Sequence, residues 1–287
     1  MNNDEPSYIL TITCPDTVGI VAAVASYLRD QNFFVEESSH YGDRESGQFF
    51  LRTRFCTNGQ PWDEHAFRKN FAQISEHFDM HWDIHDTTVR PRVLIMVSRH
   101  DHCLNDLLYR YRTGSLRMDI PAIVSNHEEL RELAEWHRVP FHHIPVTADT
   151  KRDAERQLLE IVQQTGAELI ILARYMQVLT DQLCARMQGQ IINIHHSFLP
   201  GFKGAQPYRK AHERGVKLIG ATAHYVTCDL DEGPIIEQMV ERVDHTDGVA
   251  ELTAVGRDVE SITLARAVKY HIDHRVFLNG QRTVVFR

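Results

Sequence analysis

Residues 191–200 read IINIHHSFLP, an apolar run that ends in a cluster of polar side chains. The run 191–194 predicts a short buried strand, and Asn193 and His195 then point to the same side because strand side chains alternate. An amide and an imidazole side by side suit acyl chemistry. Asn193 can donate to an oxyanion from a fixed position, and His195 can transfer a proton near neutral pH. The structural alternative is that Asn193 caps the strand and His195 packs in a satisfied pocket.

The sequence on both sides of this stretch, from residue 93 onward, alternates short apolar runs with helical patterns. This rhythm predicts an α/β fold with a doubly wound, mostly parallel sheet, in which ligands bind at the carboxyl ends of the strands. A long helix is expected over 248–274, and Asn279-Gly280 is a strong hairpin signal. The expected strands cover residues 93–97, 120–124, 141–146, 169–172, 191–194, 218–226 and 234–243.

The N-terminal part of the chain has a different pattern. Apolar side chains at helical spacing predict one helix that begins near Gly19 and another over 63–78. With the strands, the order becomes βαββαβ, which is the ferredoxin-like plan. The expected strands are residues 8–13, a strand that begins at 33–35, then 49–55 and 80–84.

A polar stretch with a proline separates the two patterns. It reads DTTVRPR over residues 86–92 and leads directly into the apolar run VLIMV. Such a change is typical of a linker that enters a buried strand. We expect an N-terminal domain over residues 1–88, a linker over 89–92 and a second domain over 93–287.

The composition excludes several classes of protein. The 287 residues are 43% hydrophobic and 24% charged, as in ordinary globular domains and unlike disordered or fibrous chains. The net charge of −8 argues against a nucleic-acid partner. No apolar run reaches the ~18–20 residues of a membrane span, and the acidic N-terminus is unlike a secretory signal. The five scattered cysteines, without a CxxC pair, favour a reduced, cytoplasmic compartment.

A second polar constellation reads HYVTCDLDEGP over residues 224–234. It places three carboxylates before a Gly-Pro turn into the next strand. Asp231 can orient a histidine and stabilise its charged form. Read alone, the stretch fits a solvated acidic turn better, because Asp and Gly favour turns generally.

The chain has 18 histidines, so metal binding has to be considered. The sequence His100-Asp101-His102-Cys103 offers a compact His-x-His-Cys that could bind zinc. It lacks a second spaced pair, and it follows the first strand of the sheet, where a ligand loop is expected in any case. We therefore expect no metal.

Together these motifs resemble a known family. The pattern Asn193-Ile194-His195-x-Ser197 with Leu199-Pro200, followed by the constellation around Asp231, is similar to the signature of the formyltetrahydrofolate-dependent formyltransferases. The N-terminal Cys14-Pro15-Asp16-x-x-Gly19-Ile20 resembles an ACT domain, a module that senses amino acids. An ACT domain before this fold, with the His195-His196 doublet, resembles the formyltetrahydrofolate deformylases, which hydrolyse 10-formyltetrahydrofolate to tetrahydrofolate and formate.

The resemblance implies roles for matched positions. Asn193, His195 and Asp231 match the family's catalytic asparagine, histidine and aspartate. It also implies a homo-oligomer with a glycine or methionine effector near the loop of Asp16, Gly19 and Ile20. The folate substrate would bind at Arg174, Tyr175, Met176, Val178, Leu179, Ser197, Val226 and Thr227.

One departure from the family separates hydrolysis from transfer. Purine-pathway transferases carry a glycine- and serine-rich loop that binds the phosphate of glycinamide ribonucleotide, whereas residues 98–103 here read SRHDHC, with no glycine. Asp101 would repel a phosphate, so water becomes the expected nucleophile, without metal or cofactor. The released formate would feed purine synthesis and balance one-carbon pools.

Three other functions stay open at this point. They are formyl transfer to an amine that lacks a phosphate, an amino-acid sensor whose second domain is a binding relic, and a His-rich zinc hydrolase. The roles of His196 and of the loop 98–103 are also open.

Overall fold

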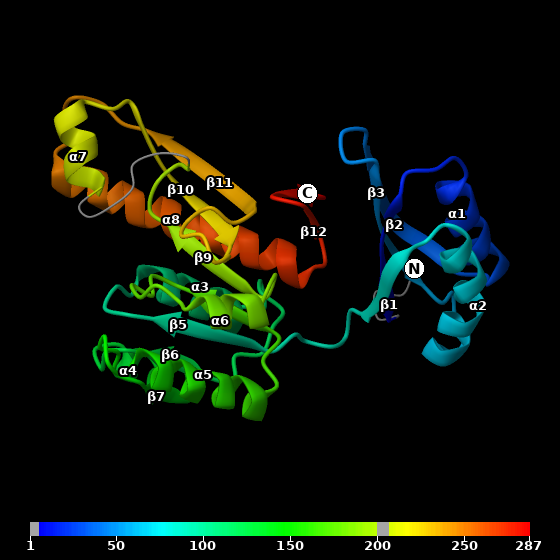
Figure 1. The fold of residues 1–287 in the computed structure, drawn as a ribbon, viewed down its shortest axis with the longest axis horizontal. Helices are drawn as coiled ribbons and strands as arrows, with labels where there is room; N and C mark the ends of the chain where they lie inside the picture. Colours follow the sequence, from blue (N-terminus) through cyan, green and yellow to red (C-terminus); the bar gives the residue numbers. More distant parts are fainter. Residues whose placement is uncertain (1–5, 200–206) are drawn as a thin grey trace. The chain divides into compact units, whose positions relative to one another are not determined.

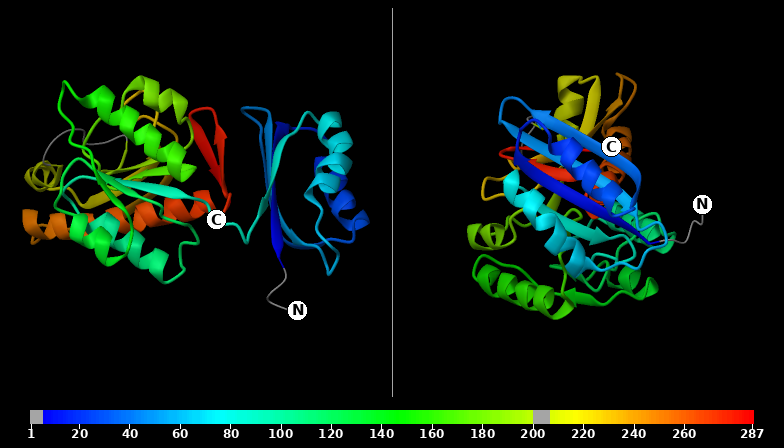
Figure 2. Two further views of the ribbon diagram at one scale, coloured as in Figure 1. Left: turned by 90° about the horizontal axis from the view of Figure 1, so that it is seen from below. Right: turned by 90° about the vertical axis from the view of Figure 1, so that its right-hand side faces the viewer.

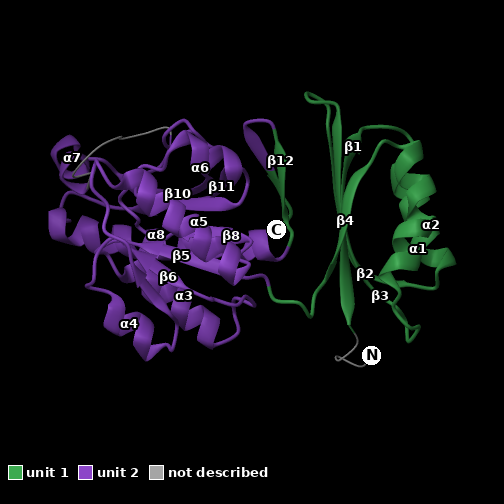
Figure 3. Ribbon diagram, turned by 60° about the horizontal axis from the view of Figure 1, so that its bottom comes forward, with its two compact units in different colours: residues 1–90, 274–279, 284–287 green, residues 91–273, 280–283 purple. Residues whose placement is uncertain are grey.

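The computed structural model describes residues 6–199 and 207–287, and the chain divides into two compact units (Figure 3). Unit 1 comprises Met1–Arg90, His274–Asn279 and Val284–Arg287, and unit 2 comprises Pro91–Asp273 and Gly280–Thr283. The chain passes from one unit to the other inside the predicted linker 89–92. The C-terminal hairpin, which we expected to belong wholly to the domain 93–287, is shared between the units.

Unit 1 has the predicted βαββαβ order and forms an ACT-like fold (Figure 1). Its strands make an antiparallel four-stranded sheet in the order β2-β3-β1-β4. The apolar side of β1, with Leu10 and Ile12, packs against Leu28 and Phe71 of the two helices. The elements are β1 (Ser7–Pro15), α1 (Ile20–Asp30), β2 (Phe34–Asp43), β3 (Gln48–Cys56), α2 (Glu64–His77) and β4 (His81–Asp86).

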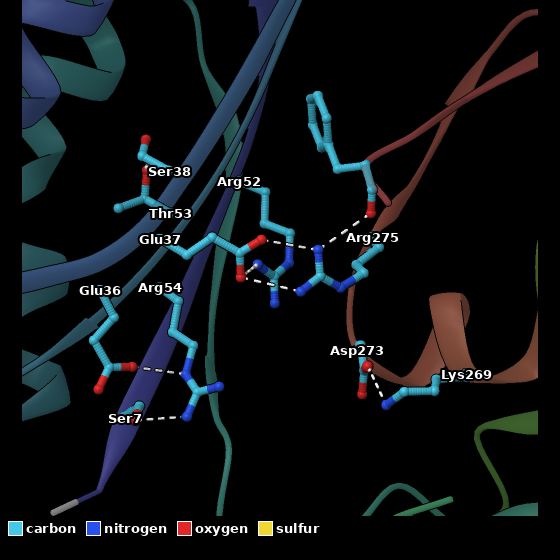
Figure 4. Close-up of polar contacts among 11 residues, drawn as sticks. Ser7, Glu36, Glu37, Ser38, Arg52, Thr53, Arg54, Lys269, Asp273 and Arg275 are labelled. Carbon is cyan, nitrogen blue, oxygen red and sulfur yellow. Dashed lines mark hydrogen bonds and ion pairs between the residues drawn. The ribbon is translucent and has the colours of Figure 1, made fainter.

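The C-terminal tail joins unit 1 through charged side chains on β2 and β3 (Figure 4). Arg275 donates to both carboxylate oxygens of Glu37, at 2.9 and 3.0 Å, and the buried Arg52 donates to the same carboxylate at 3.1 Å. Asn279 donates to Asp43 at 2.7 Å. The hydrogen bond from Arg275 holds the pKa of Glu37 below its usual value, so the carboxylate is charged at neutral pH. These long-range pairs explain why the tail groups with the N-terminal sheet.

Unit 2 contains the predicted doubly wound sheet. Its seven strands have the order β11-β10-β9-β8-β5-β6-β7. The neighbours from β9 to β7 are parallel, whereas β10 runs antiparallel to both β9 and β11. The chain winds outward from β5 in both directions, which places a topological switch point beside β5. The strands are β5 (Val93–Val97), β6 (Ile123–Ser125), β7 (Phe141–His143), β8 (Leu169–Leu172), β9 (Ile191–His195), β10 (Leu218–Tyr225) and β11 (Ile235–Arg242).

Helices cover both faces of this sheet (Figure 2). On one face, Leu94 and Met96 of β5 pack with Leu158 of α5 and Leu183 of α6. On the other, α3 and α8 contact each other, and α8 packs on β9, β10 and β11. None of the described helices is long and apolar enough to cross a membrane. The helices are α3 (His102–Arg112), α4 (Arg131–Trp136), α5 (Lys151–Thr165), α6 (Asp181–Arg186), α7 (Pro207–Arg214) and α8 (Val249–Ile272).

Several predicted boundaries differ from the structure, three of them near a proline or at a turn. The strand expected over 120–124 starts at Ile123, because Pro121 has no N–H to give to a ladder. The strand expected over 141–146 ends at His143, two residues before Pro145. The last hairpin, β12 (Val276–Asn279) and β13 (Arg282–Val285), turns one residue later than expected, with Gly280 at φ 61°.

Candidate active site

A cavity of about 590 Å³ lies at the carboxyl ends of β8 and β9, where the doubly wound plan places ligands. Ser197, predicted to bind substrate, does not line it: the residue is buried and its carbonyl accepts a hydrogen bond from Thr222 at 2.9 Å. The other predicted residues of this domain all line the cavity: Asn193, His195, Asp231, Arg174, Tyr175, Met176, Val178, Leu179, Val226 and Thr227.

Strand pairing positions the amide of Asn193. In the antiparallel ladder of β9 and β10, Asn193 lies directly opposite His224, and its Nδ2 is 3.3 Å from Nε2 of His224. Nδ1 of His224 lies 2.9 Å from the carbonyl of Tyr225, which can only accept, so Nδ1 carries a proton. Neutral His224 then accepts from Asn193 at Nε2. This bond fixes the amide and leaves its second N–H for a ligand.

His195 and Asp231 form a hydrogen-bonded pair beside this amide. Nδ1 of His195 donates to Oδ2 of Asp231 at 3.1 Å, and the second carboxylate oxygen is 3.7 Å from Nε2 of His224. Partial burial raises the pKa of Asp231, but the hydrogen bond from His195 and the nearby imidazole of His224 outweigh it and hold the pKa well below the usual range. Nε2 of His195 is buried and has no hydrogen-bond partner among residues 6–199 and 207–287. This imidazole, whose residue lines the cavity, therefore has a ring nitrogen left for a ligand.

A tight loop brings Asp231 to its partner. After β10 the chain turns back, and the amide of Tyr225 donates to the carbonyl of Pro234 at 2.9 Å. Gly233 permits this approach, because a Cβ there would lie 1.8 Å from the carbonyl oxygen of Tyr225. Asp231 itself has a left-handed φ of 57°, a conformation that aspartate tolerates better than most residues. The Gly-Pro turn is thus part of how the site is built.

The opposite wall of the cavity is apolar and partly open. Met176, Val178 and Leu230 are each more than half exposed, although they are large apolar side chains. Tyr175 also lines the cavity, and burial raises the pKa of its hydroxyl to about 12. Apolar side chains around a few fixed polar groups are typical of a site for a small organic ligand.

Next to Arg174, which lines the cavity, lies a cluster of side chains of the types that bind zinc. His102, Cys103 and Glu260 place one donor atom each within 4.8 Å of one another. However, His102 donates to Glu260 at 2.7 Å, Tyr208 donates to the same carboxylate at 2.6 Å, and Arg174 Nε is 3.4 Å away. Arg174 already supplies positive charge at this carboxylate and opposes a second cation. Hydrogen bonds and ion pairs account for the cluster without a metal.

The predicted effector residues lie in the loop that connects β1 to α1. Asp16 is exposed, and its backbone amide donates to Gly47 at 2.8 Å. Gly19 has φ 102° and caps α1, a backbone conformation that favours glycine. Ile20 is buried in the core of unit 1, so its side chain anchors the loop and does not face a ligand.

The structure adds residues to the site that the sequence reasoning did not assign. His224 positions Asn193, and strand alternation opposite Asn193 is the signal that could have found it. His100 and His196, whose roles the sequence left open, both line the cavity. Glu260 comes from α8, far along the chain, and no local motif marks it.

A family model, sequence relatives and solved structures were compared with this chain, and the three comparisons agree. A family model described as formyl transferase matches residues 91–268. The formyltetrahydrofolate deformylase of Corynebacterium sp. (strain P-1) is 49% identical, over 99% of this chain and 100% of the relative. The crystal structure of the deformylase from Burkholderia mallei ATCC 23344 superposes with a TM-score of 0.94 and 56% identity, covering 98% of this chain and 100% of that one.

A transferase structure is similar at a greater distance. Glycinamide ribonucleotide transformylase 1 from Symbiobacterium toebii superposes with a TM-score of 0.65 and 27% identity. It covers 71% of this chain and 98% of its own length. The match with the deformylases, in contrast, extends over both units.

Proposed function

This chain belongs to the formyltetrahydrofolate deformylases, which are hydrolases of the formyl transferase family, and from this premise we propose how its residues carry out the reaction. The proposed reaction is hydrolysis of 10-formyltetrahydrofolate to tetrahydrofolate and formate. The observation that supports it most is the convergence of Asn193, His195 and Asp231 in one cavity.

The proposed mechanism is direct attack of water on the formyl carbon. His195 Nε2 accepts a proton from the water, while the free N–H of Asn193 donates to the formyl oxygen as it becomes an oxyanion. Asp231 stays ionised, orients His195 through Nδ1 and stabilises its charged form. His195 then gives the proton to N10, the C–N10 bond breaks, and formate and tetrahydrofolate leave. These roles need no metal or cofactor.

The region after β5 supports water over an amine that carries a phosphate. Residues 98–103 contain no glycine, and the last two begin α3. His102 is held by Glu260 at 2.7 Å, so its ring does not reach out to a ligand. A loop of this kind offers no cradle of backbone amides for a phosphate.

The test is to incubate the purified chain with 10-formyltetrahydrofolate, without an amine and after exhaustive chelation, and to follow formate and tetrahydrofolate together. We expect both products in equal amounts, at a rate that chelation does not change. Turnover that requires an added amine would make the chain a transferase. Loss of turnover on chelation, restored by zinc, would favour the zinc hydrolase instead, and no turnover with any of these would leave a binding protein.

We also propose that unit 1 binds a small amino acid and pairs with a second copy of the chain. The exposed loop at Asp16 and Gly19 supports the first part. The second is supported by β2, an edge strand whose Phe34, Val35 and Tyr41 are exposed apolar side chains. We expect glycine or methionine to change the rate of formate release.

Light scattering and steady-state rates test this regulation. The expected result is a dimer or larger assembly, together with a rate that responds to glycine or methionine and loses the response in Asp16→Ala. A monomer whose rate ignores both amino acids would contradict the proposal.

The physiological role follows from the product. We propose that the formate feeds purine synthesis and that the reaction balances one-carbon pools in the cytoplasm. All five cysteines are free thiols, and four of them are buried, which is compatible with a reduced compartment.

A further inference from the structure

Arg174 connects the buried cluster of α8 to the cavity. Its side chain is 12% exposed, and its guanidinium lies between the carboxylate of Glu260 and Nδ1 of His196, with Nη1 3.0 Å from that ring nitrogen. Burial raises the pKa of Glu260, but the hydrogen bond from His102 and the charge of Arg174 outweigh it and lower the pKa. Glu260 is therefore a charged group that holds Arg174 in one place.

The cluster is built to keep this geometry. Gly256 makes room for Tyr208, because a Cβ at Gly256 would lie 2.1 Å from the Tyr208 hydroxyl that donates to Glu260. Arg174 has a left-handed φ of 64°, which is costly for a long side chain and persists where the surroundings require it. Such strain is typical of functional sites.

The contact with Arg174 decides which nitrogen of His196 carries the proton. A guanidinium has five N–H donors and no acceptor, so Nδ1 of His196 must accept. The ring is then neutral, with its proton on Nε2. His195 has the opposite arrangement, since Asp231 accepts the proton of its Nδ1 and leaves a lone pair on Nε2.

The two imidazoles lie next to each other and both line the cavity. Their rings stack with centroids 4.7 Å apart and an angle of 21° between the planes. One therefore presents an acceptor at Nε2 and the other a donor. Neighbouring stacked rings that both line the cavity lie beside the same volume, so one water there can serve both imidazoles.

We propose that His196 is a second catalytic imidazole, whose Nε2–H donates to the oxygen of the attacking water while Nε2 of His195 accepts one of its protons. The inference rests on the proposed hydrolysis and deepens it. Arg174 is the positioning residue, and it acts through the tautomer of His196. Glu260 holds Arg174 in turn.

The step balances without a further reactant. The water oxygen forms a bond to the formyl carbon, and one water proton passes to Nε2 of His195. The C–N10 bond breaks as that proton moves to N10, which releases tetrahydrofolate and formic acid, and the latter ionises to formate. His196 keeps its own proton throughout and fixes the orientation of the water.

The same donor selects water over amines. A water oxygen has two lone pairs, so one accepts from His196 and the other attacks. A neutral amine nitrogen has a single lone pair, and a hydrogen bond from His196 would occupy the electrons that have to attack. The neutral, Nε2-protonated His196 therefore favours hydrolysis through its hydrogen bond. This effect adds to that of the loop 98–103, which has no cradle for a phosphate.

The first test compares two replacements of His196 in the full-length chain, with formate release and formohydroxamate formation from added hydroxylamine measured side by side. His196→Leu removes the donor, and we expect kcat for formate to fall about 100-fold with KM nearly unchanged. His196→Gln keeps an N–H near the same place and is expected to retain kcat within about 10-fold. His142→Leu, at an exposed histidine of β7 outside the cavity, is the matched control and should not change either rate.

The product ratio separates a catalytic role from a structural one. Hydroxylamine supplies its own strong nucleophile, so in His196→Leu the ratio of hydroxamate to formate should rise at least about 10-fold over the wild-type ratio. A purely structural defect would lower both products together and leave the ratio unchanged. An unchanged ratio, or formate release near the wild-type rate, would overturn the inference.

Nitrogen-15 spectra of histidine-labelled protein test the tautomer directly. The His196 signals, assigned by their loss in His196→Gln, should show an unprotonated Nδ1 and a protonated Nε2. In Arg174→Met they should move toward a mixture of tautomers. A protonated Nδ1 in the wild-type protein would overturn the inference. The proposed hydrolysis fails separately, through absence of formate from the wild-type chain.

Discussion

Replacement of His195 by alanine is expected to lower kcat for formate release about 10³-fold. The reason is Nε2 of this imidazole, which belongs to a residue that lines the cavity, is buried and has no hydrogen-bond partner among residues 6–199 and 207–287. Without this imidazole, the reaction loses the group to which the mechanism assigns the transfer of the water proton to N10. Steady-state formation of formate by the purified variant gives the measurement.

Chemical rescue gives this prediction its control. His195 is 5% exposed, so alanine leaves a hole that added imidazole can enter. We expect imidazole in the buffer to restore part of the rate in His195→Ala but none in Asn193→Ala, whose missing group is an oxyanion donor. Thermal melts check that both variants stay folded. A His195→Ala rate within about threefold of wild type would remove this residue from the mechanism.

The architecture of both units could be predicted from local patterns. In unit 1, helical spacing of apolar residues alternates with strand runs, and the βαββαβ order is confirmed. In unit 2, continuous apolar runs such as that of β5 mark strands buried on both faces. The predicted strands at 120–124 and 141–146 were too long, because the apolar pattern continued across Pro121 and Pro145 while the hydrogen-bond ladder did not.

The C-terminal tail shows what local patterns leave out. Arg275 and Glu37 are 238 residues apart in sequence, and the residues around each of them do not predict the contact. Their pairing depends on where the finished sheet places β2. The hairpin signal at Asn279-Gly280 predicted a turn at the right place within one residue, but it could not say which unit the strands would join.

The candidate site also contains residues that local patterns predicted and residues that only the fold brings together. Asn193 and His195 share a strand, so alternation predicted their common direction, whereas Asp231 reaches them only because the loop closes over Gly233. No local motif marks Glu260, but its position in α8 is informative. It stands on the buried stripe of α8, four residues after Gly256 and three before Thr263, all of them buried. A carboxylate on such a stripe requires partners, although the sequence does not name them.

Replacement of Asp231 by asparagine is expected to lower kcat roughly 10³–10⁴-fold, as loss of the carboxylate does in comparable hydrogen-bonded triads. The side chain keeps its size but changes its hydrogen bonding. If the new amide turns its NH₂ to His195, the proton of the ring moves to Nε2 and the atom that accepts the water proton loses its lone pair. If it turns its oxygen, the tautomer survives but the charge that stabilises the imidazolium is gone. Formate release at saturating substrate measures the loss.

Glu232→Gln is the matched control, because this neighbouring carboxylate is exposed and does not line the cavity. Its rate should stay within about twofold of wild type. The pH dependence of stability gives an independent check. The pKa of Asp231 lies below 3.8 in the folded chain, so the ionised carboxylate stabilises the fold above that pH, and this contribution is lost as the pH falls through the folded value. Asp231→Asn should therefore destabilise the chain more at neutral pH than in acid. If the destabilisation were equal at both while formate release stayed high, Asp231 would be neither the charged partner of His195 nor part of the reaction.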